Sequence, residues 1–414
     1  MAAPTLGKFE MTAALSDLTG WLIQQGLENT PIDAWLEQMC HRINDAGIPI
    51  TRVNLSTRAH HPEIGAVAFR WHRDQESEQF EYRRSVDSND VVEEYRRSPL
   101  YHLMMSHSSE LRQRLDVPDP ELDFPIFEEL RERGATDYYA AKRFFLHKNQ
   151  DRPSDPFALE EGMTISMVTD VPGGFTEAQL DGLRALLAPI SLTLKSGANR
   201  KMAEDITAAY LGTDASRRVL SGDIMRGSSE TISAVIWYFD LRGFTSLSET
   251  LGAEAIIGLL NDYFALAVDV VEEYGGNVLK FMGDGMLAIF DLKDVPEARL
   301  KAIEAACALR EAFAEMNRTR EKGGHPTTGF TLGLHAGDVL YGNIGGKTRL
   351  DFTVIGPAVN TTARILGMSG PVGQDIVISS AVARPLLDSR PDLVSLGAYR
   401  LRGVKDRQEL FTLD

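Results

Sequence analysis

Two acidic residues in the second half of the chain stand where a divalent metal ion could bind. Asp240 ends the apolar run ISAVIWYF, and Asp284 follows NVLKFMG. Both runs are rich in β-forming residues, so each carboxylate is expected at a strand end or in the turn after it. If the strands pair, both carboxylates can bind hard cations through oxygen. Two such ions about 3.5–4 Å apart would clamp an attacking and a leaving oxygen around phosphorus.

The turn after Asp240 is suited to bind phosphate. Gly243, Phe244 and Thr245 begin a helix, and the free backbone N–H groups at a helix start can hold a phosphate. The alternative is that either aspartate only caps a turn. For Asp284 alone, in an Asp-Gly turn, that alternative would be the better one. The pair together favours a metal and phosphate site.

The elements that must position these residues alternate regularly from residue 231 onward. The strand before Asp240 is continuously apolar, as expected of a strand covered on both faces. Next come a long amphipathic helix that ends at Gly275 and Gly276, a hairpin around Asp284-Gly285 and a helix over 295–320. Further strands and a helix with Pro357 near its start complete the domain. This order predicts an α/β sandwich with helices on a mainly antiparallel sheet.

Three sequence blocks in this region resemble the active-site blocks of the class III nucleotidyl cyclases. They are DLRGFT at 240–245, KFMGD at 280–284 and TVIGPAVNTTAR at 353–364. The resemblance covers about 231–414. It implies an α+β fold in which the C-terminal domain is a ferredoxin-like or palm-type sandwich.

The resemblance also implies which residues bind the metals and the base. Asp240 and Asp284 would bind two Mg²⁺ or Mn²⁺ ions, with the carbonyl of Leu241 as an additional ligand. Lys280 and Thr353 would contact the purine. Lys280 with Thr353 resembles the bacterial subgroup, class IIIb, that makes cyclic AMP. A hydroxyl both donates and accepts, so adenine is favoured without strict rejection of guanine.

The remaining implied roles concern the ribose and the phosphates. Asn360 would orient the ribose, and Arg364 would stabilise the charge that grows on the phosphates. The two lie four residues apart on a predicted helix, so they share one face. Lys405 is a candidate contact to the triphosphate.

The family shares each active site between two subunits, and one chain here holds the full set. A symmetric homodimer with two equivalent sites is therefore expected. The predicted function is an adenylate cyclase that converts ATP to 3′,5′-cyclic AMP and pyrophosphate. The alternatives are a guanylate cyclase and a catalytically silent module that binds a nucleotide.

Residues 1–200 are predicted to form a regulatory α/β domain. Amphipathic helices are expected over 11–45, and a long helix is expected from Phe175 to about Arg200 with Thr176 as its N-cap. Strands are expected between them at 51–56, 65–74, 80–86, 137–145 and 163–171. This order resembles a GAF-like sensory domain for an unknown small-molecule or protein signal. Residues 201–230 are predicted to be a connector, which either acts as a bland linker or transmits that signal.

Composition narrows the class of protein. The formal charge of −16 argues against binding to nucleic acid or to an anionic membrane surface. Cys40 and Cys307 are the only cysteines, so no disulfide framework is expected. No signal peptide or membrane-spanning segment is predicted, which favours a soluble protein of the cytoplasm. Six histidines in the first domain have no spacing that matches a metal-ligand set: His60, His61, His72, His102, His107 and His147.

Overall fold

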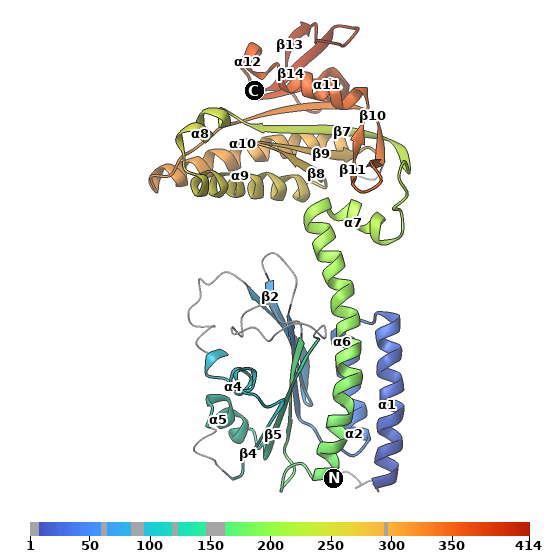
Figure 1. The fold of residues 1–414 in the computed structure, drawn as a ribbon. Helices are drawn as coiled ribbons and strands as arrows, with labels where there is room; N and C mark the ends of the chain where they lie inside the picture. The colour runs from blue at the N-terminus through green and yellow to red at the C-terminus, as the bar shows by residue number, and fades with distance from the viewer. Residues whose placement is uncertain (1–7, 59–63, 84–94, 118–122, 146–161, 294–296) are drawn as a thin grey trace. The chain divides into compact units, whose positions relative to one another are not determined.

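The computed structural model describes residues 8–58, 64–83, 95–117, 123–145, 162–293 and 297–414 (Figure 1). The chain separates into two compact units, Met1–Ile206 and Thr207–Asp414. Some features named in the sequence analysis lie outside the described residues. They are three of the histidines, the end of the strand predicted at 80–86 and the start of the helix predicted at 295–320; the histidines are His60, His61 and His147. The α+β class with antiparallel-rich sheets is confirmed.

The first unit is built on a six-stranded antiparallel sheet in the order β3-β2-β1-β6-β5-β4. A large apolar core lies between one face of this sheet and three helices, and a smaller core lies between the other face and two short helices (Figure 1). The strands are β1 (Arg52–Arg58), β2 (Ile64–His72), β3 (Gln75–Arg83), β4 (Glu110–Arg114), β5 (Asp137–Phe144) and β6 (Gly162–Thr169). The helices of the large core are α1 (Lys8–Glu28), α2 (Ile32–Asp45) and α6 (Glu177–Leu211); those of the small core are α4 (Pro99–Met105) and α5 (Pro125–Glu132).

Helix α6 begins where the sequence predicts and ends later. The N–H of Gln179 donates to Thr176 Oγ1 over 3.3 Å, and the N–H of Thr176 donates to Gln179 Oε1 over 2.9 Å. This reciprocal capping confirms Thr176 as the N-cap. The helix was expected to end near Arg200 but continues to Leu211, because KMAEDITAAYL contains no helix breaker. Ion pairs one turn apart support the extension, with Arg200–Glu204 and Lys201–Asp205 at 2.8 Å each.

The second unit is built on an eight-stranded sheet in the order β13-β14-β12-β10-β7-β9-β8, with β11 paired to β10. All of its pairings are antiparallel except that of β10 with β12. Its strands are β7 (Ser229–Leu241), β8 (Asn277–Met282), β9 (Gly285–Asp291), β10 (Phe330–Gly345), β11 (Leu350–Ile355), β12 (Ile376–Ser379), β13 (Leu393–Tyr399) and β14 (Gln408–Leu413). Its helices are α7 (Thr213–Leu220), α8 (Phe244–Thr250), α9 (Ala253–Glu273), α10 (Ala298–Lys322), α11 (Pro357–Leu366), α12 (Ser369–Val372) and α13 (Ser380–Ala383).

The sheet of the second unit has two different faces. Odd-numbered residues of β7, such as Trp237 and Phe239, pack with α9 and α10 in the largest apolar core. Even-numbered residues, such as Ile236 and Tyr238, belong to a second core with α7, α11 and β11. Figure 1 shows α9 and α10 on one side of the sheet and α11 on the other. Asp240 continues the even-numbered row, so it faces the side of the sheet on which α11 lies.

Helix α11 lies directly against β10 because two glycines leave room for it. A Cβ atom at Gly333 would stand 2.9 Å from the backbone nitrogen of Leu366, and one at Gly337 would stand 2.8 Å from the Cβ of Ala358. Side chains at either position would push the helix outward. This close approach fixes the position of α11, the helix that carries Asn360 and Arg364.

The hairpin between β8 and β9 turns one residue earlier than predicted. Met282 pairs with Gly285, so the two loop residues are Gly283 and Asp284 rather than Asp284 and Gly285. Gly283 has a φ of 68°, which only glycine adopts without strain. Gly285 instead lies within β9, where an added Cβ would stand 3.0 Å from an Asp240 carboxylate oxygen. The shift places Asp284 at the tip of the hairpin.

None of the helices in the described part of the chain is both long enough and apolar enough to cross a membrane.

Candidate active site

Strand pairing brings the two predicted metal ligands to one end of the sheet. Asp240 pairs with Gly285 across β7 and β9, directly beside Asp284 in the hairpin loop. The backbone N–H of Leu241 donates to the carbonyl oxygen of Asp284 over 3.1 Å. The carboxylates of Asp240 and Asp284 are thereby held near each other by backbone hydrogen bonds rather than by their own side chains.

The two carboxylates repel each other in the metal-free protein. Burial raises the pKa of Asp240 to about 6, and the charge of Asp284 adds to the increase. The same surroundings raise the pKa of Tyr238, through burial first and then through both aspartates. Within the described residues, no hydrogen bond or ion pair to either carboxylate offsets this repulsion.

This donor set fits a hard divalent cation. Two carboxylates and the nearby carbonyl of Leu241 are the oxygen ligands that Mg²⁺ and Mn²⁺ prefer, and a bound cation would remove the repulsion that raises the pKa of Asp240. The described residues contain no group of three or more metal-ligating side chains. A cation held by the two carboxylates would therefore need backbone or solvent oxygens to complete its coordination.

The turn after Asp240 is anchored at several points. The N–H of Arg242 donates to the carbonyl of Gly329 over 2.8 Å, and Thr328 Oγ1 donates to the carbonyl of Arg242 over 2.8 Å. Arg242 also forms an ion pair with Asp375. Gly243 has a φ of 68° and caps α8, so the chain turns sharply and presents the N–H groups of Phe244 and Thr245 at the first turn of the helix.

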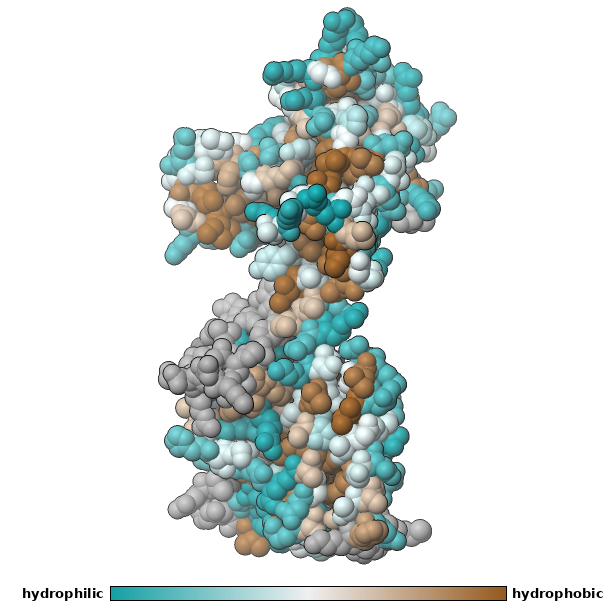
Figure 2. All heavy atoms as spheres, turned by 45° about the vertical axis from the view of Figure 1, so that its right-hand side comes forward, coloured by the Kyte–Doolittle hydropathy of each residue, from teal (hydrophilic) through white to brown (hydrophobic). Residues whose placement is uncertain are grey.

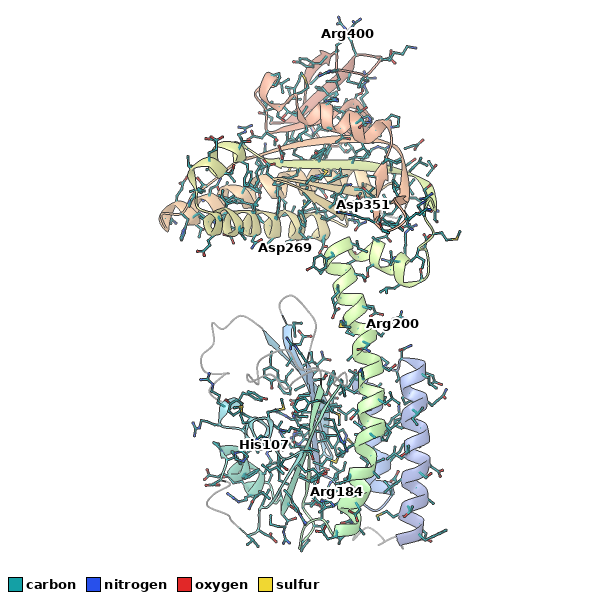
Figure 3. All side chains as sticks on the ribbon, in the orientation of Figure 1. His107, Arg184, Arg200, Asp269, Asp351 and Arg400 are labelled. Atoms are coloured by element: carbon teal, nitrogen blue, oxygen red, sulfur yellow. The ribbon has the colours of Figure 1, made fainter. Side chains whose placement is uncertain are left out.

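Lys280 and Thr353 lie near each other on neighbouring elements. Lys280 Nζ on β8 lies 3.0 Å from Oδ2 of Asp351 on β11, and Thr353 is two residues further along the same strand. Figure 3 labels Asp351. Residues two apart share a face of a strand, so Asp351 and Thr353 point to the same side. Thr353 is only 5% exposed, and its buried Oγ1 has no hydrogen-bond partner in the described structure. A buried hydroxyl in this state is free to bind a ligand.

Asn360 and Arg364 lie on the exposed side of α11. The opposite side of this helix is buried through Ala358, Thr362 and Ile365. Lys405 is exposed in the loop between β13 and β14. Within the described residues, no hydrogen bond or ion pair joins any of these three polar residues to the aspartate pair. One chain thus brings together Asp240 with Asp284, and Lys280 with Thr353, but does not join all the predicted residues in one site.

Sequence reasoning missed Asp351. The residue stands two positions before Thr353 in LDFTVI, and this spacing was the only available clue. The contact of Asp351 with Lys280 depends on β11 lying beside β8, which the sequence alone did not indicate. His335 on β10 has a partner within the same unit, because its Nδ1 lies 2.9 Å from Ser379 Oγ.

A family model described as "Adenylate and Guanylate cyclase catalytic domain" matches residues 228–414. This part of the chain is a cyclase catalytic domain. The matched region, 228–414, contains all of β7 (Ser229–Leu241) and every block singled out from the sequence.

The chain is similar over part of its length to two curated proteins and to one solved structure. "Adenylate cyclase" from Anabaena cylindrica is 36% identical over 174 residues, which cover 41% of this chain and 34% of that protein. "Adenylate cyclase 1" from Rhizobium meliloti is 29% identical over 181 residues, which cover 42% and 26%. The chain thus spans about a third or less of the length of these two relatives. The crystal structure of the adenylyl cyclase CyaB from P. aeruginosa aligns over 45% of this chain and 96% of that chain, with 24% identity and a TM-score of 0.41.

Replacing Asp240 by asparagine is expected to stabilise the metal-free protein. Because the pKa of Asp240 is raised in the folded state, folding favours its protonated form, and stability is lost as the pH rises from about 4 through 6. At pH 7.5 Asp240→Asn should increase the free energy of unfolding by about 1 kcal/mol, since solvent screens part of the repulsion. Below pH 4 the difference should vanish. Denaturant unfolding at both pH values measures it.

The same variant should lose stabilisation by metal. Mn²⁺ is expected to raise the unfolding midpoint of the wild type at pH 7.5 but not that of Asp240→Asn. Asp269→Asn is the control, because Asp269 is exposed on α9 and should leave both responses unchanged. Equal stabilisation of Asp240→Asn and wild type by Mn²⁺ would exclude Asp240 as a ligand.

Proposed function

We propose that this protein is an adenylate cyclase. The observation that carries the proposal is the paired Asp240 and Asp284 at one end of a sheet whose neighbouring strands also present Lys280 and Thr353. The cyclase family match and the relatives that are named adenylate cyclases support it. In the reaction, the ribose 3′-oxygen attacks the α-phosphorus of ATP, the bond to the β-phosphate oxygen breaks, and cyclic AMP and pyrophosphate form.

The aspartate pair would hold the metal ions of the reaction. Asp240, Asp284 and the carbonyl of Leu241 would bind two Mg²⁺ or Mn²⁺ ions, which supply charge neutralisation at the attacking and leaving oxygens. The N–H groups of Gly243, Phe244 and Thr245 would bind the phosphates in the anchored turn. Because Arg242 ties this turn to Thr328 and Gly329, just before β10, the turn holds its donors in place before the substrate arrives.

Lys280 and Thr353 would recognise adenine. The ammonium group of Lys280 would donate to a ring nitrogen, and the buried Thr353 hydroxyl would accept from the exocyclic amine. The unpartnered state of Thr353 Oγ1 supports this role, since a ligand would satisfy it. Asp351 would hold the ammonium group of Lys280 in place. These features support the class IIIb assignment of the Lys–Thr pair.

A homodimer would complete the site. Asn360 and Arg364 face away from the core of their own chain, so they are placed to act on a substrate that the partner's aspartates hold. Exposed apolar side chains on the cyclase domain support association: Phe281 is 51% exposed, Ile355 46% and Leu340 44%. Figure 2 shows apolar patches on the surface of this unit. Arg364 would stabilise charge on the phosphates, Asn360 would orient the ribose and Lys405 would contact the triphosphate.

Residues 1–200 would form a GAF-like regulatory domain of a cytoplasmic enzyme, and residues 201–230 would transmit its signal to a catalytic domain over 231–414. Support for a transmitting role comes from α7, which the cyclase sheet holds firmly. Tyr341 Oη donates to Asp214 on α7 over 2.8 Å, and Asn277 at the start of β8 donates to Tyr341 Oη over 3.3 Å. Movement of α7 would therefore reach the strand that carries Lys280. The β-α-β-β-α-β order from β7 to β10 supports the ferredoxin-like interpretation of the cyclase domain.

Guanylate cyclase activity is the second candidate. The Thr353 hydroxyl can donate as well as accept, so it does not exclude the guanine carbonyl. A catalytically silent module is less consistent with the sequence, which retains both aspartates, Asn360 and Arg364.

Purified protein incubated with Mn²⁺ and ATP should produce cyclic AMP, and the rate should fall at least about a hundredfold in Asp240→Ala, because two-metal chemistry depends on this ligand. Separation of products by chromatography measures the rate. Competing GTP in the same assay decides the base preference. Wild type that makes no more cyclic AMP than Asp240→Ala would refute the proposed activity.

Asp351→Asn should weaken adenine recognition without affecting the metals. Lys280 loses its charged partner and its fixed position, so kcat/KM for ATP is expected to fall about tenfold, equivalent to about 1.4 kcal/mol. Stabilisation by Mn²⁺ should stay at the wild-type level, which separates a local effect from misfolding. An unchanged kcat/KM would mean that Lys280 does not depend on Asp351.

A further inference from the structure

Among the described residues of the first unit, Arg52 is a buried arginine without a hydrogen-bond or ion-pair partner. Arg52 on β1 is only 9% exposed. Within the described residues it makes no hydrogen bond, ion pair or ring contact. Burying an unpaired charge costs several kcal/mol, so a protein rarely retains one without a use for it.

A second guanidinium with an unused donor lies on the next strand. Arg52 pairs with His72 and Asn54 pairs with Arg70 across β1 and β2, so Arg52 and Arg70 are diagonal neighbours on one face. The Nε of Arg70 is buried and has no hydrogen-bond partner. Two adjacent strands therefore direct incompletely satisfied guanidinium groups to the same side of the sheet.

The surrounding charges do not balance these cations. Glu78 lies 3.9 Å from Arg70, and Glu129 already forms an ion pair with Arg133 at 2.9 Å. Burial lowers the pKa of Arg52, and the charge of Arg70 lowers it further. Burial also lowers the pKa of His72, and Arg52, Arg133 and Arg70 reinforce that effect. Among the described residues, positive charge thus exceeds negative charge around Arg52.

Neutral polar groups line the same face. Asn54 and Ser166 pair across β1 and β6, and both are buried. Tyr138, buried on β5, hydrogen-bonds Ser166. The opposite face of the same strands is apolar and packs against α1, α2 and α6. Packing alone would favour apolar residues on this face as well, because α4 and α5 cover part of it.

We propose that this face of the first unit, centred on Arg52 and Arg70, binds a small ligand through an oxyanion group, a carboxylate or a phosphate. A planar guanidinium can hold either group with two parallel hydrogen bonds. Asn54 supplies an amide beside Arg52 for the polar remainder of the ligand. The site is independent of the cyclase chemistry, and it gives the first unit a ligand class rather than an unspecified signal.

The test uses the full-length protein with inorganic phosphate and acetate as probes, at constant ionic strength and with chloride as the reference anion. Amide hydrogen exchange is measured in β1 and β2. One of the two probes should slow exchange about tenfold when present at ten times its Kd, because binding stabilises the native state. Protection by phosphate alone or by acetate alone identifies the oxyanion. The probes are tested up to about 50 mM, which corresponds to a binding free energy of about 2 kcal/mol. If neither probe protects β1 and β2 within this range, the proposal is overturned.

Arg52→Met separates binding from a structural role. If Arg52 serves a ligand, replacing its unpaired charge by an apolar side chain of similar length should raise the unfolding midpoint of the ligand-free protein and abolish protection by the probe. Arg97→Met is the matched control, because Arg97 is exposed and should keep the wild-type response. A lower midpoint in Arg52→Met, or undiminished protection in it, would contradict the proposal. These readouts do not involve nucleotide turnover, so they stand whether or not the protein makes cyclic AMP.

Discussion

The repulsion between Asp240 and Asp284 is the constraint around which the cyclase domain is arranged. Pairing of β7 with β9 fixes Asp240 beside the hairpin loop, and the hydrogen bond from Leu241 to Asp284 fixes the loop. Burial then raises the pKa of Asp240 to about 6. The protein tolerates this unfavourable arrangement because a large apolar core on the other face of the sheet holds the strands in register. In our proposal, a divalent cation offsets this repulsion.

The other polar residues of the candidate site lie in two places on this domain. Lys280 and Thr353 stand on β8 and β11, where Asp351 aligns the ammonium group. Asn360 and Arg364 stand on the outer side of α11, whose position is set by its close approach to Gly333 and Gly337. A single chain therefore prepares parts of a site without assembling it. In our proposal, association of two chains becomes a condition for catalysis, and any signal that changes this association changes the rate.

Much of this arrangement could be predicted from the sequence because its patterns are local. The apolar run before Asp240, the helix start at Pro357 and the cap at Thr176 each depend on neighbouring residues only. The turn between β8 and β9 was placed one residue too late, because Gly283 and Gly285 both flank Asp284 and only strand register decides between them. The contact of Lys280 with Asp351 joins residues 71 positions apart, and the surroundings of Arg52 depend on the pairing of β1 with β2 and with β6. Such features follow from tertiary structure and leave no periodic pattern.

The most direct test of the account uses two inactive variants together. Asp240→Ala and Arg364→Ala are co-expressed with different tags, and the heterodimer is purified. One of its two sites then contains the intact aspartate pair of one chain and the intact Arg364 of the other, while the second site lacks both. We predict that neither variant alone makes cyclic AMP and that the heterodimer recovers about half of the wild-type rate, since one of two equivalent sites is whole. A heterodimer as inactive as its parents, or full activity in either parent, would contradict a catalytic site shared between two subunits.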